Sequence, residues 1–181
     1  MDIIAIALTT IVLISSLWIF YNTPAFIVGF NQWIKVRRGK EERLEPVDPP
    51  DDFQPRVSII VPVKNEESVI ERLLCALVKS DYPDKEVIVI EDGSTDRTPN
   101  ICQKWAQDHP FLIKYVHSNQ SNGKPSAINL GAKAATGEIV AVYDADTIPE
   151  PGTLQKVVPY FKDTNVAAVQ GELRTVNPDE S

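Results

Sequence analysis

The sequence has few cysteines and lacks the spacings typical of a disulfide framework or a zinc site. Cys75 and Cys102 are the only two among 181 residues, and no Cys-x-x-Cys or Cys/His pattern occurs. Each falls in a stretch expected to form an amphipathic helix, where a free thiol behaves as a small apolar side chain. These features argue against a disulfide-stabilised secreted domain and favour a reducing compartment.

Basic residues are too few for a protein that binds nucleic acid. The chain has 18 lysines and arginines against 25 acidic residues, which gives a formal net charge of −7. Affinity for a nucleic-acid backbone requires a basic face that this composition does not supply. We therefore expect no nucleic-acid partner.

Two common nucleotide-binding motifs are also absent. No Gly-x-Gly-x-x-Gly follows the first expected strand, so the nicotinamide and flavin fingerprint is missing. The segment that ends in Gly123-Lys124 superficially resembles a phosphate-binding loop. That pattern requires glycine where Ser118 stands, and no strand leads directly into a glycine-rich loop there. Neither a dinucleotide-binding domain nor a P-loop domain is expected.

A long uncharged run is present at the N-terminus. No residue from Ile3 to Tyr21 is charged, and a helix over about residues 3–22 would span a hydrocarbon core of about 30 Å. The positive start and the small-residue cleavage site of a signal peptide are missing. We expect a retained membrane anchor over residues 1–34, in which Pro24 ends the spanning helix or kinks it into an interfacial segment over residues 25–34.

Basic residues after this anchor predict its orientation in the cell membrane. They are Lys35, Arg37, Arg38 and Lys40. Because lysine and arginine next to a membrane segment tend to stay in the cytoplasm, the N-terminus is expected outside and the following domain inside. The lipid bilayer is thus an expected partner. Residues 35–55 turn from basic to acidic and proline-rich, which indicates an extended tether.

Residues 56–181 alternate short apolar runs with helical patterns. Strands are expected at 57–61, 86–90, 112–117 and 139–143, and helices at 66–79, 99–108 and 126–135. Asn65 and Thr98 suit the N-caps of the first two helices. A further helix begins at Pro151, and a short strand is expected at 166–169. Runs that are apolar on both faces and alternate with helices predict an α/β fold with a mainly parallel sheet and helices on both faces.

Acidic side chains follow three of these expected strands. They lie in Pro62–Glu66, in Asp92–Asp96 and in Asp144-Ala145-Asp146. The carboxyl ends of parallel strands form one rim, where ligands of such sheets bind. Paired carboxylates suit Mg²⁺ or Mn²⁺ when substrate phosphates complete the metal's shell.

Lys124, just before an expected helix, adds the positive charge that a diphosphate needs. Taken singly, each acidic motif is compatible with a plain turn or strand cap, and Lys124 with a solvated loop lysine. Together they predict phosphate chemistry at the rim.

Five ordered blocks resemble family 2 glycosyltransferases. They are Val57–Glu66, Glu91–Asp96, Asn122–Asn129, Thr136-Gly137-Glu138 and Asp144-Ala145-Asp146. The similarity covers roughly residues 55 to 175 and is greatest to the membrane-bound branch of cellulose, chitin and hyaluronan synthases. Two departures from the family pattern bear on the preference for the nucleobase or for the sugar donor. Glu91 stands where many relatives carry Asp, and Lys64 stands where some carry Tyr.

The resemblance implies a GT-A fold and a metal-dependent, inverting transfer from a nucleotide-diphospho-sugar to a polysaccharide or lipid acceptor. A UDP-sugar is the favoured donor. The resemblance places Asp92 at the nucleobase and Lys124 at the nucleotide. It places Asp144 by the ribose and diphosphate, and Asp146, together with Asp144, at the Mg²⁺ or Mn²⁺ ion. Pro62 and Glu66 complete the expected donor-binding set.

Inverting transfer also needs a general base on the acceptor hydroxyl, and the sequence does not identify one. In the resembling family this acid lies well beyond the Asp-x-Asp block, and Glu172 is too close to that block to be assigned. We therefore expect a truncated product or fragment, the N-terminal donor-binding part of a larger domain. Two alternatives stay open: a catalytically silent nucleotide-sugar-binding or assembly module and, with less support, a nucleotidyltransferase.

Overall fold

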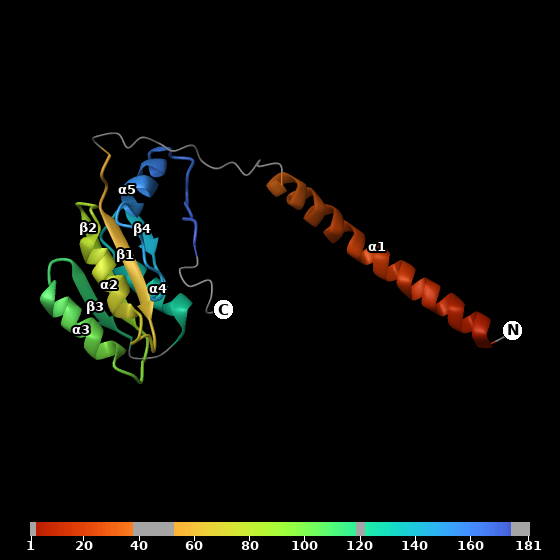
Figure 1. Ribbon diagram of the computed structural model, residues 1–181, viewed down its shortest axis with the longest axis horizontal. Helices are drawn as coiled ribbons and strands as arrows, with labels where there is room; N and C mark the ends of the chain where they lie inside the picture. Colours follow the sequence, from red (N-terminus) through yellow and green to blue (C-terminus); the bar gives the residue numbers. More distant parts are fainter. Residues whose placement is uncertain (1–2, 38–52, 119–121, 175–181) are drawn as a thin grey trace. The chain divides into compact units, whose positions relative to one another are not determined.

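The computed structural model describes residues 3–37, 53–118 and 122–174 (Figure 1). The chain divides into two compact units, residues 1–45 and residues 46–181. Most of the tether expected over residues 35–55 lies outside the described residues, as do two members of the expected basic cluster, Arg38 and Lys40.

The described part of the first unit is one helix, α1, Ile3–Arg37. Its stretch Ala5–Asn31 is apolar and long enough to cross a membrane, by length and composition. The helix continues through Pro24, so the alternative in which it ends at this residue is wrong, while the alternative of a kink into an interfacial segment stays a prediction. A proline removes one backbone donor, whereas a helix that stopped inside a membrane, where this segment is expected to lie, would leave several backbone groups without partners.

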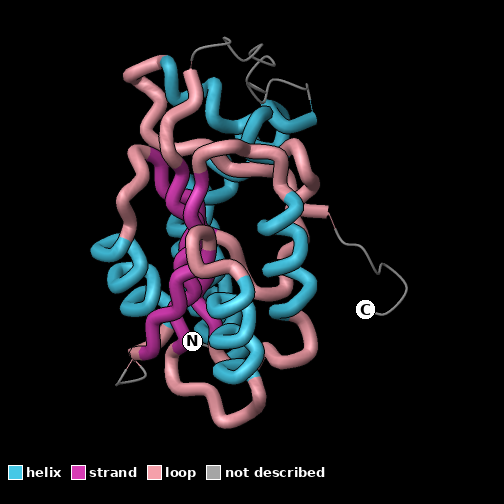
Figure 2. The backbone as a smooth tube through the Cα atoms, turned by 90° about the vertical axis from the view of Figure 1, so that its left-hand side faces the viewer, coloured by secondary structure: helices cyan, strands magenta, loops and turns pink. Residues whose placement is uncertain are grey.

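The second unit is built on a parallel sheet. Its strands are β1 Val57–Val63, β2 Lys85–Glu91, β3 Ile113–His117 and β4 Ile139–Val142. They lie in the order β3-β2-β1-β4, and every neighbouring pair is parallel. Figure 2 shows the strands side by side with helices on both sides. The expected α/β fold with a parallel sheet is therefore confirmed.

Helices cover the two faces of this sheet unequally. Helices α2 Ile70–Lys79 and α3 Thr98–Asp108 pack on one face, joined by α5 Thr153–Val157 and the 3₁₀ helix η1 Val158–Lys162. Helix α4, Lys124–Ala134, packs on the other. Alternation along β1 explains the division, because Ile59 and Val61 point to the first cluster and Ile60 to the second.

Both cysteines lie in helices of the first face, as the sequence predicts. Cys75 is half-buried in α2, and Cys102 is buried in α3. Burial raises the pKa of the Cys102 thiol to about 12, so this side chain serves as an apolar packing group.

The two predicted helix caps are wrong. Helix α2 begins at Ile70, after a turn, and Asn65 instead adopts a φ of 55° and accepts the backbone N–H of Thr95. The Thr98 hydroxyl accepts the N–H of Glu66 at 2.9 Å and does not cap its own helix. In both places a bond between two loops replaces the local cap, which a single stretch of sequence does not reveal.

The short strand predicted at residues 166–169 is also not formed. These residues have no regular structure and pair with no strand of the described sheet. A run of four residues has too little periodicity to separate a strand from an extended connection.

Candidate functional site

A pocket of about 330 Å³ opens where β1, β2 and β4 end, beside the N-terminus of α4. It is lined by Pro62, Val63, Lys64, Glu66, Asp92, Gly123, Lys124, Ala127, Asp144, Ala145 and Asp146. All six residues that the sequence predicts for the donor and metal site lie on this one pocket. They come from four separate segments of the chain, which the parallel sheet brings to the same rim.

Asp92 links the end of β2 to the start of α4. Its side chain is buried, and its carboxylate accepts the N–H of Gly123 at 3.0 Å and that of Asn122 at 3.3 Å. Gly123 has a φ of 82°, a conformation that favours glycine. Asp92 therefore holds the loop that delivers Lys124 to the pocket.

Lys124 and Asp144 meet across the pocket. Lys124 Nζ lies 2.5 Å from Asp144 Oδ1, and the two side chains are 56% and 51% exposed. An ion pair this open to solvent contributes little to stability. Both charged groups therefore remain available to a ligand that enters the pocket.

The two acids after β4 are separated by a residue that faces the core. Ala145 is buried and belongs to the cluster under α2, whereas Asp144 and Asp146 are exposed on the pocket. The ladder continues past β4, since the Tyr143 N–H donates to the Ile60 carbonyl at 3.1 Å. The anchored alanine and this bond fix where the carboxylates stand.

The carboxylate oxygens that line the pocket are suitable ligands for a hard divalent cation. Asp144 and Asp146 supply carboxylate oxygens, but nowhere in the described ranges do three or more His, Cys, Asp or Glu side chains gather as a ready metal site. Mg²⁺ is often held by one or two carboxylates with substrate phosphates in its remaining positions. The pocket thus suits a cation that arrives with a phosphate ligand.

Two loops on the rim of the pocket are joined by hydrogen bonds. The β1–α2 loop and the β2–α3 loop exchange bonds between Asn65 and Ser94, Asn65 and Thr95, Glu66 and Thr98, Glu67 and Asp96, and Arg97 and Glu67. Because these bonds run in both directions, they tie the two loops together. Asn65, with its left-handed backbone, takes part in two of them.

A buried carboxylate next to Asp92 supports the β2–α3 loop. Glu91 is fully buried, and its Oε2 lies 2.6 Å from His117 Nδ1. Burial alone would raise the pKa of Glu91, but hydrogen bonds from Ser94 and the contact with His117 outweigh it and lower the pKa. The sequence did not assign this pair, and the signal that was available is an acid at the end of an otherwise apolar strand.

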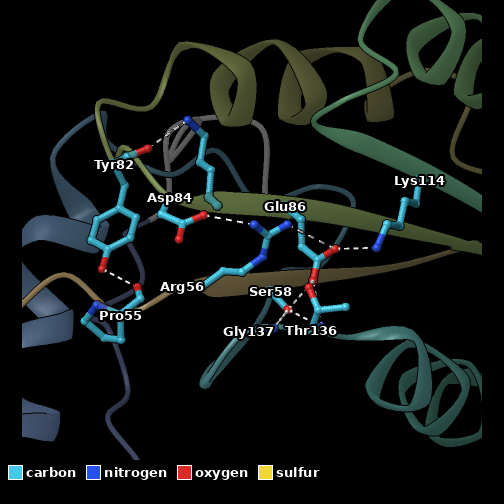
Figure 3. Close-up of polar contacts among 10 residues, drawn as sticks. Pro55, Arg56, Ser58, Tyr82, Asp84, Glu86, Lys114, Thr136 and Gly137 are labelled. Carbon is cyan, nitrogen blue, oxygen red and sulfur yellow. Dashed lines mark hydrogen bonds and ion pairs between the residues drawn. The ribbon is translucent and has the colours of Figure 1, made fainter.

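A second buried carboxylate lies at the opposite end of the sheet (Figure 3). Glu86 Oε1 accepts the Ser58 hydroxyl and both the N–H and the hydroxyl of Thr136, each at 2.7 Å. Its Oε2 accepts Lys114 Nζ at 2.6 Å. Burial would raise the pKa of Glu86, but these bonds hold it at about 2. Sequence reasoning did not single out Glu86.

Solved structures with the same architecture place this fold among the GT-A nucleotide-diphospho-sugar transferases. The mannosyltransferase PcManGT from Pyrobaculum calidifontis, in complex with GDP-Man and Mn²⁺, superposes with a TM-score of 0.69 and 33% identity over 82% of this chain and 44% of that chain. S. aureus TarS 1-349 in complex with UDP-GlcNAc gives 0.55 and 32% identity over 61% of this chain and 32% of that chain.

Sequence relatives narrow this class to one family. The model described as "Glycosyl transferase family 2" matches residues 58–181, and the chain belongs to this family. A probable glycosyltransferase, YdaM, of Bacillus subtilis is 31% identical over 91% of this chain and 40% of its own length. Beta-monoglucosyldiacylglycerol synthase of a Nostoc species is 40% identical over 70% of this chain and 28% of its own length.

A further relative is poly-beta-1,6-N-acetyl-D-glucosamine synthase of Staphylococcus epidermidis, which is 30% identical over 84% of this chain and 37% of its own length. The chain therefore spans between 28% and 40% of the length of these three relatives. The resemblance to family 2 that the five blocks indicated is confirmed.

Proposed function

We propose that the pocket binds the nucleotide diphosphate of a sugar donor together with Mg²⁺ or Mn²⁺. The sugar would then be transferred, with inversion, to a polysaccharide or lipid acceptor. One observation carries the proposal: four carboxylates and a lysine from four separate segments of the chain converge on one pocket of a family 2 glycosyltransferase.

Each of the six residues predicted from the sequence has a role in this proposal. Asp146, with Asp144, would hold the cation, and Lys124 would leave Asp144 to contact the phosphates. A bound cation would stabilise the negative charge that develops on the departing nucleoside diphosphate. Asp92 would contact the nucleobase, while Pro62 and Glu66 would border the nucleotide.

The nucleobase and the acceptor are open to direct tests. We propose UDP as the nucleotide, and the solved neighbours hold GDP-Man in one case and UDP-GlcNAc in the other. The relatives' names include a glycolipid synthase and a polysaccharide synthase, which supports a lipid or polysaccharide acceptor.

Glu172 pairs with Arg174 at 3.3 Å and does not line the pocket, so we assign it no role as the general base.

Titration calorimetry of UDP and GDP, with and without Mn²⁺, tests the proposal. We expect Mn²⁺ to tighten binding of at least one nucleotide, and Asp146→Asn to weaken that binding about tenfold or more, because a metal ligand is lost. Asp108→Asn changes an exposed acid on α3 and should bind as the unaltered protein does. If neither nucleotide binds under any of these conditions, the proposal is wrong.

Activity separates the enzyme from a catalytically silent module that only binds the donor. The enzyme should release nucleotide from UDP- or GDP-sugars, faster when the acceptor is present, whereas a silent module would bind and release donors unchanged. Because the chain covers less than half of each relative's length, this assay is best made with the protein as the cell produces it.

We further propose that the chain comprises an anchor over residues 1–34, a tether over residues 35–55 and the donor-binding domain over residues 56–181. Helix α1 would cross the cell membrane with its N-terminus outside and the domain in the cytoplasm. The length and composition of Ala5–Asn31 support the anchor, and the basic residues that follow support the orientation.

A further inference from the structure

The Thr136-Gly137 turn belongs to one of the five family blocks but does not line the pocket. It joins the end of α4 to the start of β4, at the end of the sheet opposite the pocket. The function proposed above assigns no role to this turn, but the contacts of the turn indicate one.

The turn is fastened to β1 and β2 by buried polar atoms (Figure 3). Ser58 Oγ accepts the N–H of Gly137 at 2.8 Å and donates to Glu86. Glu86 also accepts two bonds from Thr136, one from the backbone and one from the hydroxyl. A single carboxylate on a central strand therefore holds the turn by its backbone and its side chain together.

Close packing holds the same turn against β1. A Cβ at Gly137 would lie 2.6 Å from the Arg56 carbonyl oxygen and 2.7 Å from the Ser58 nitrogen. The next backbone bond, from the N–H of Ile139 to the Arg56 carbonyl, is 3.2 Å long and begins the pairing of β4. The turn therefore has little freedom to slide along the sheet.

The turn joins two elements, and each of them leads to one of the two charged groups that meet in the pocket. Helix α4 has 11 residues, about 16 Å, and its first residue is Lys124. Strand β4 has only 4 residues and leads to Asp144. A strand this short is held in register by few bonds, and a slip of one residue would turn its side chains to the opposite face.

We propose that Glu86 is a positioning residue for the pocket. It holds the Thr136-Gly137 turn, and through this turn it fixes α4 and β4 so that Lys124 and Asp144 meet at the far end of the sheet. A test that measures nucleotide affinity rests on the function proposed above. The positioning of Lys124 and Asp144 by the turn depends only on the fold.

Replacement of Thr136 tests this role with little damage to the core, because this residue is exposed. Thr136→Val keeps the shape and the backbone N–H but removes the hydroxyl that bonds Glu86. Thr136→Ser keeps the hydroxyl. In the full chain with Mn²⁺, we expect Thr136→Val to raise the nucleotide Kd about three- to tenfold and Thr136→Ser to stay within about twofold.

Lys114→Met provides the matched control. It removes the Glu86 partner that comes from β3 and does not contact the turn. We expect it to lower the melting temperature and leave the nucleotide Kd unchanged. If Thr136→Val and Lys114→Met both lower the melting temperature and neither changes the Kd, the network only stabilises the fold and the proposal is overturned.

Amide hydrogen exchange gives a second readout that needs no ligand. Thr136→Val should speed exchange in residues 139–147 about tenfold relative to Lys114→Met, because the start of β4 loosens. Equal exchange in the two variants would overturn the proposal even if the protein bound no nucleotide. Failure of the proposed function would be recognised separately, by an unaltered protein that binds neither UDP nor GDP.

Discussion

At the scale of single residues, Glu86 shows how a buried charge becomes stabilising. The residue is 1% exposed, and isolated burial of a carboxylate would favour the neutral acid. Hydrogen bonds from Lys114, Ser58 and Thr136 reverse that preference and hold the pKa at about 2, against a usual value of 4.5. The folded state therefore binds this proton more weakly than the unfolded chain does.

This difference in proton binding predicts that part of the free energy of unfolding is lost in acid. The contribution of Glu86, up to about 3 kcal/mol, is complete above about pH 4.5 and is lost as the pH falls towards 2. Urea unfolding followed by circular dichroism from pH 2 to pH 7 should show this loss, and Glu86→Gln should remove it from the curve. Because Gln is neutral and forms no ion pair with the Lys114 ammonium, the variant should also be less stable at pH 7.

Glu150→Gln serves as the control for this prediction. It removes an exposed partner of Lys156 and should leave the free energy of unfolding at pH 7 nearly unchanged. A Glu86→Gln variant that loses as much stability as the unaltered protein between pH 4.5 and pH 2 would contradict the assignment.

At the scale of elements, the position of α4 depends on a close approach to the sheet. Gly131 faces Ile60, and a Cβ at this position would lie 2.5 Å from Ile60 Cγ2. The branched side chain of Ile60 is fully buried and cannot move aside freely. Glycine is thus required here by the space available between helix and strand.

Gly131→Ala should destabilise the protein by about 1–3 kcal/mol through overpacking, although alanine is favoured over glycine inside a helix by about 1 kcal/mol. Urea unfolding measures the difference. Gly152→Ala is the control, since its Cβ would approach nothing closer than Lys156 Cε at 4.0 Å. An increase in stability for Gly131→Ala would show that α4 is free to lift from the sheet.

The order of elements could be predicted because each strand is a short apolar run between helical patterns. The site could be predicted because the carboxyl ends of parallel strands share one rim, so acids after separate strands must converge. The lysine at the start of α4 follows from the same topology. Asp92, Lys124 and Asp144 therefore line one pocket as the sequence leads one to expect, while their roles toward a donor remain predictions.

The remaining details depend on contacts between segments distant in sequence. Asn65 has the composition of a helix cap, but its partner is Thr95 in another loop. Glu86 resembles the solvated first residue of a strand until Thr136, 50 positions later, closes over it. Propensity and periodicity describe one segment at a time, so they cannot reveal such partners.

At the scale of the whole molecule, the sheet separates two tasks. Its carboxyl end carries the pocket, and its amino end carries the Glu86 network that fastens the elements leading there. Under the role proposed for Glu86, a substitution that loosens the Thr136-Gly137 turn should therefore affect the pocket without touching any ligand in it, whereas Lys114→Met should not.

The proposed topology is tested on intact cells or spheroplasts. Protease added from outside should leave the domain over residues 56–181 undigested, and lysis should expose it, because the basic residues after α1 favour the cytoplasmic side. A chain without residues 1–37 should leave the membrane fraction. Digestion of the domain in intact cells would contradict the cytoplasmic placement.

If α1 is the proposed membrane anchor, its unbroken course through Pro24 bears on the thickness of the bilayer that suits it. Its apolar stretch of 27 residues measures about 40 Å along the axis, whereas an average hydrocarbon core is about 30 Å thick. As the proposed anchor, a helix of this length would tilt or thicken the surrounding lipid, and the mismatch would shrink as the bilayer grows thicker. It would thus favour thick over thin bilayers.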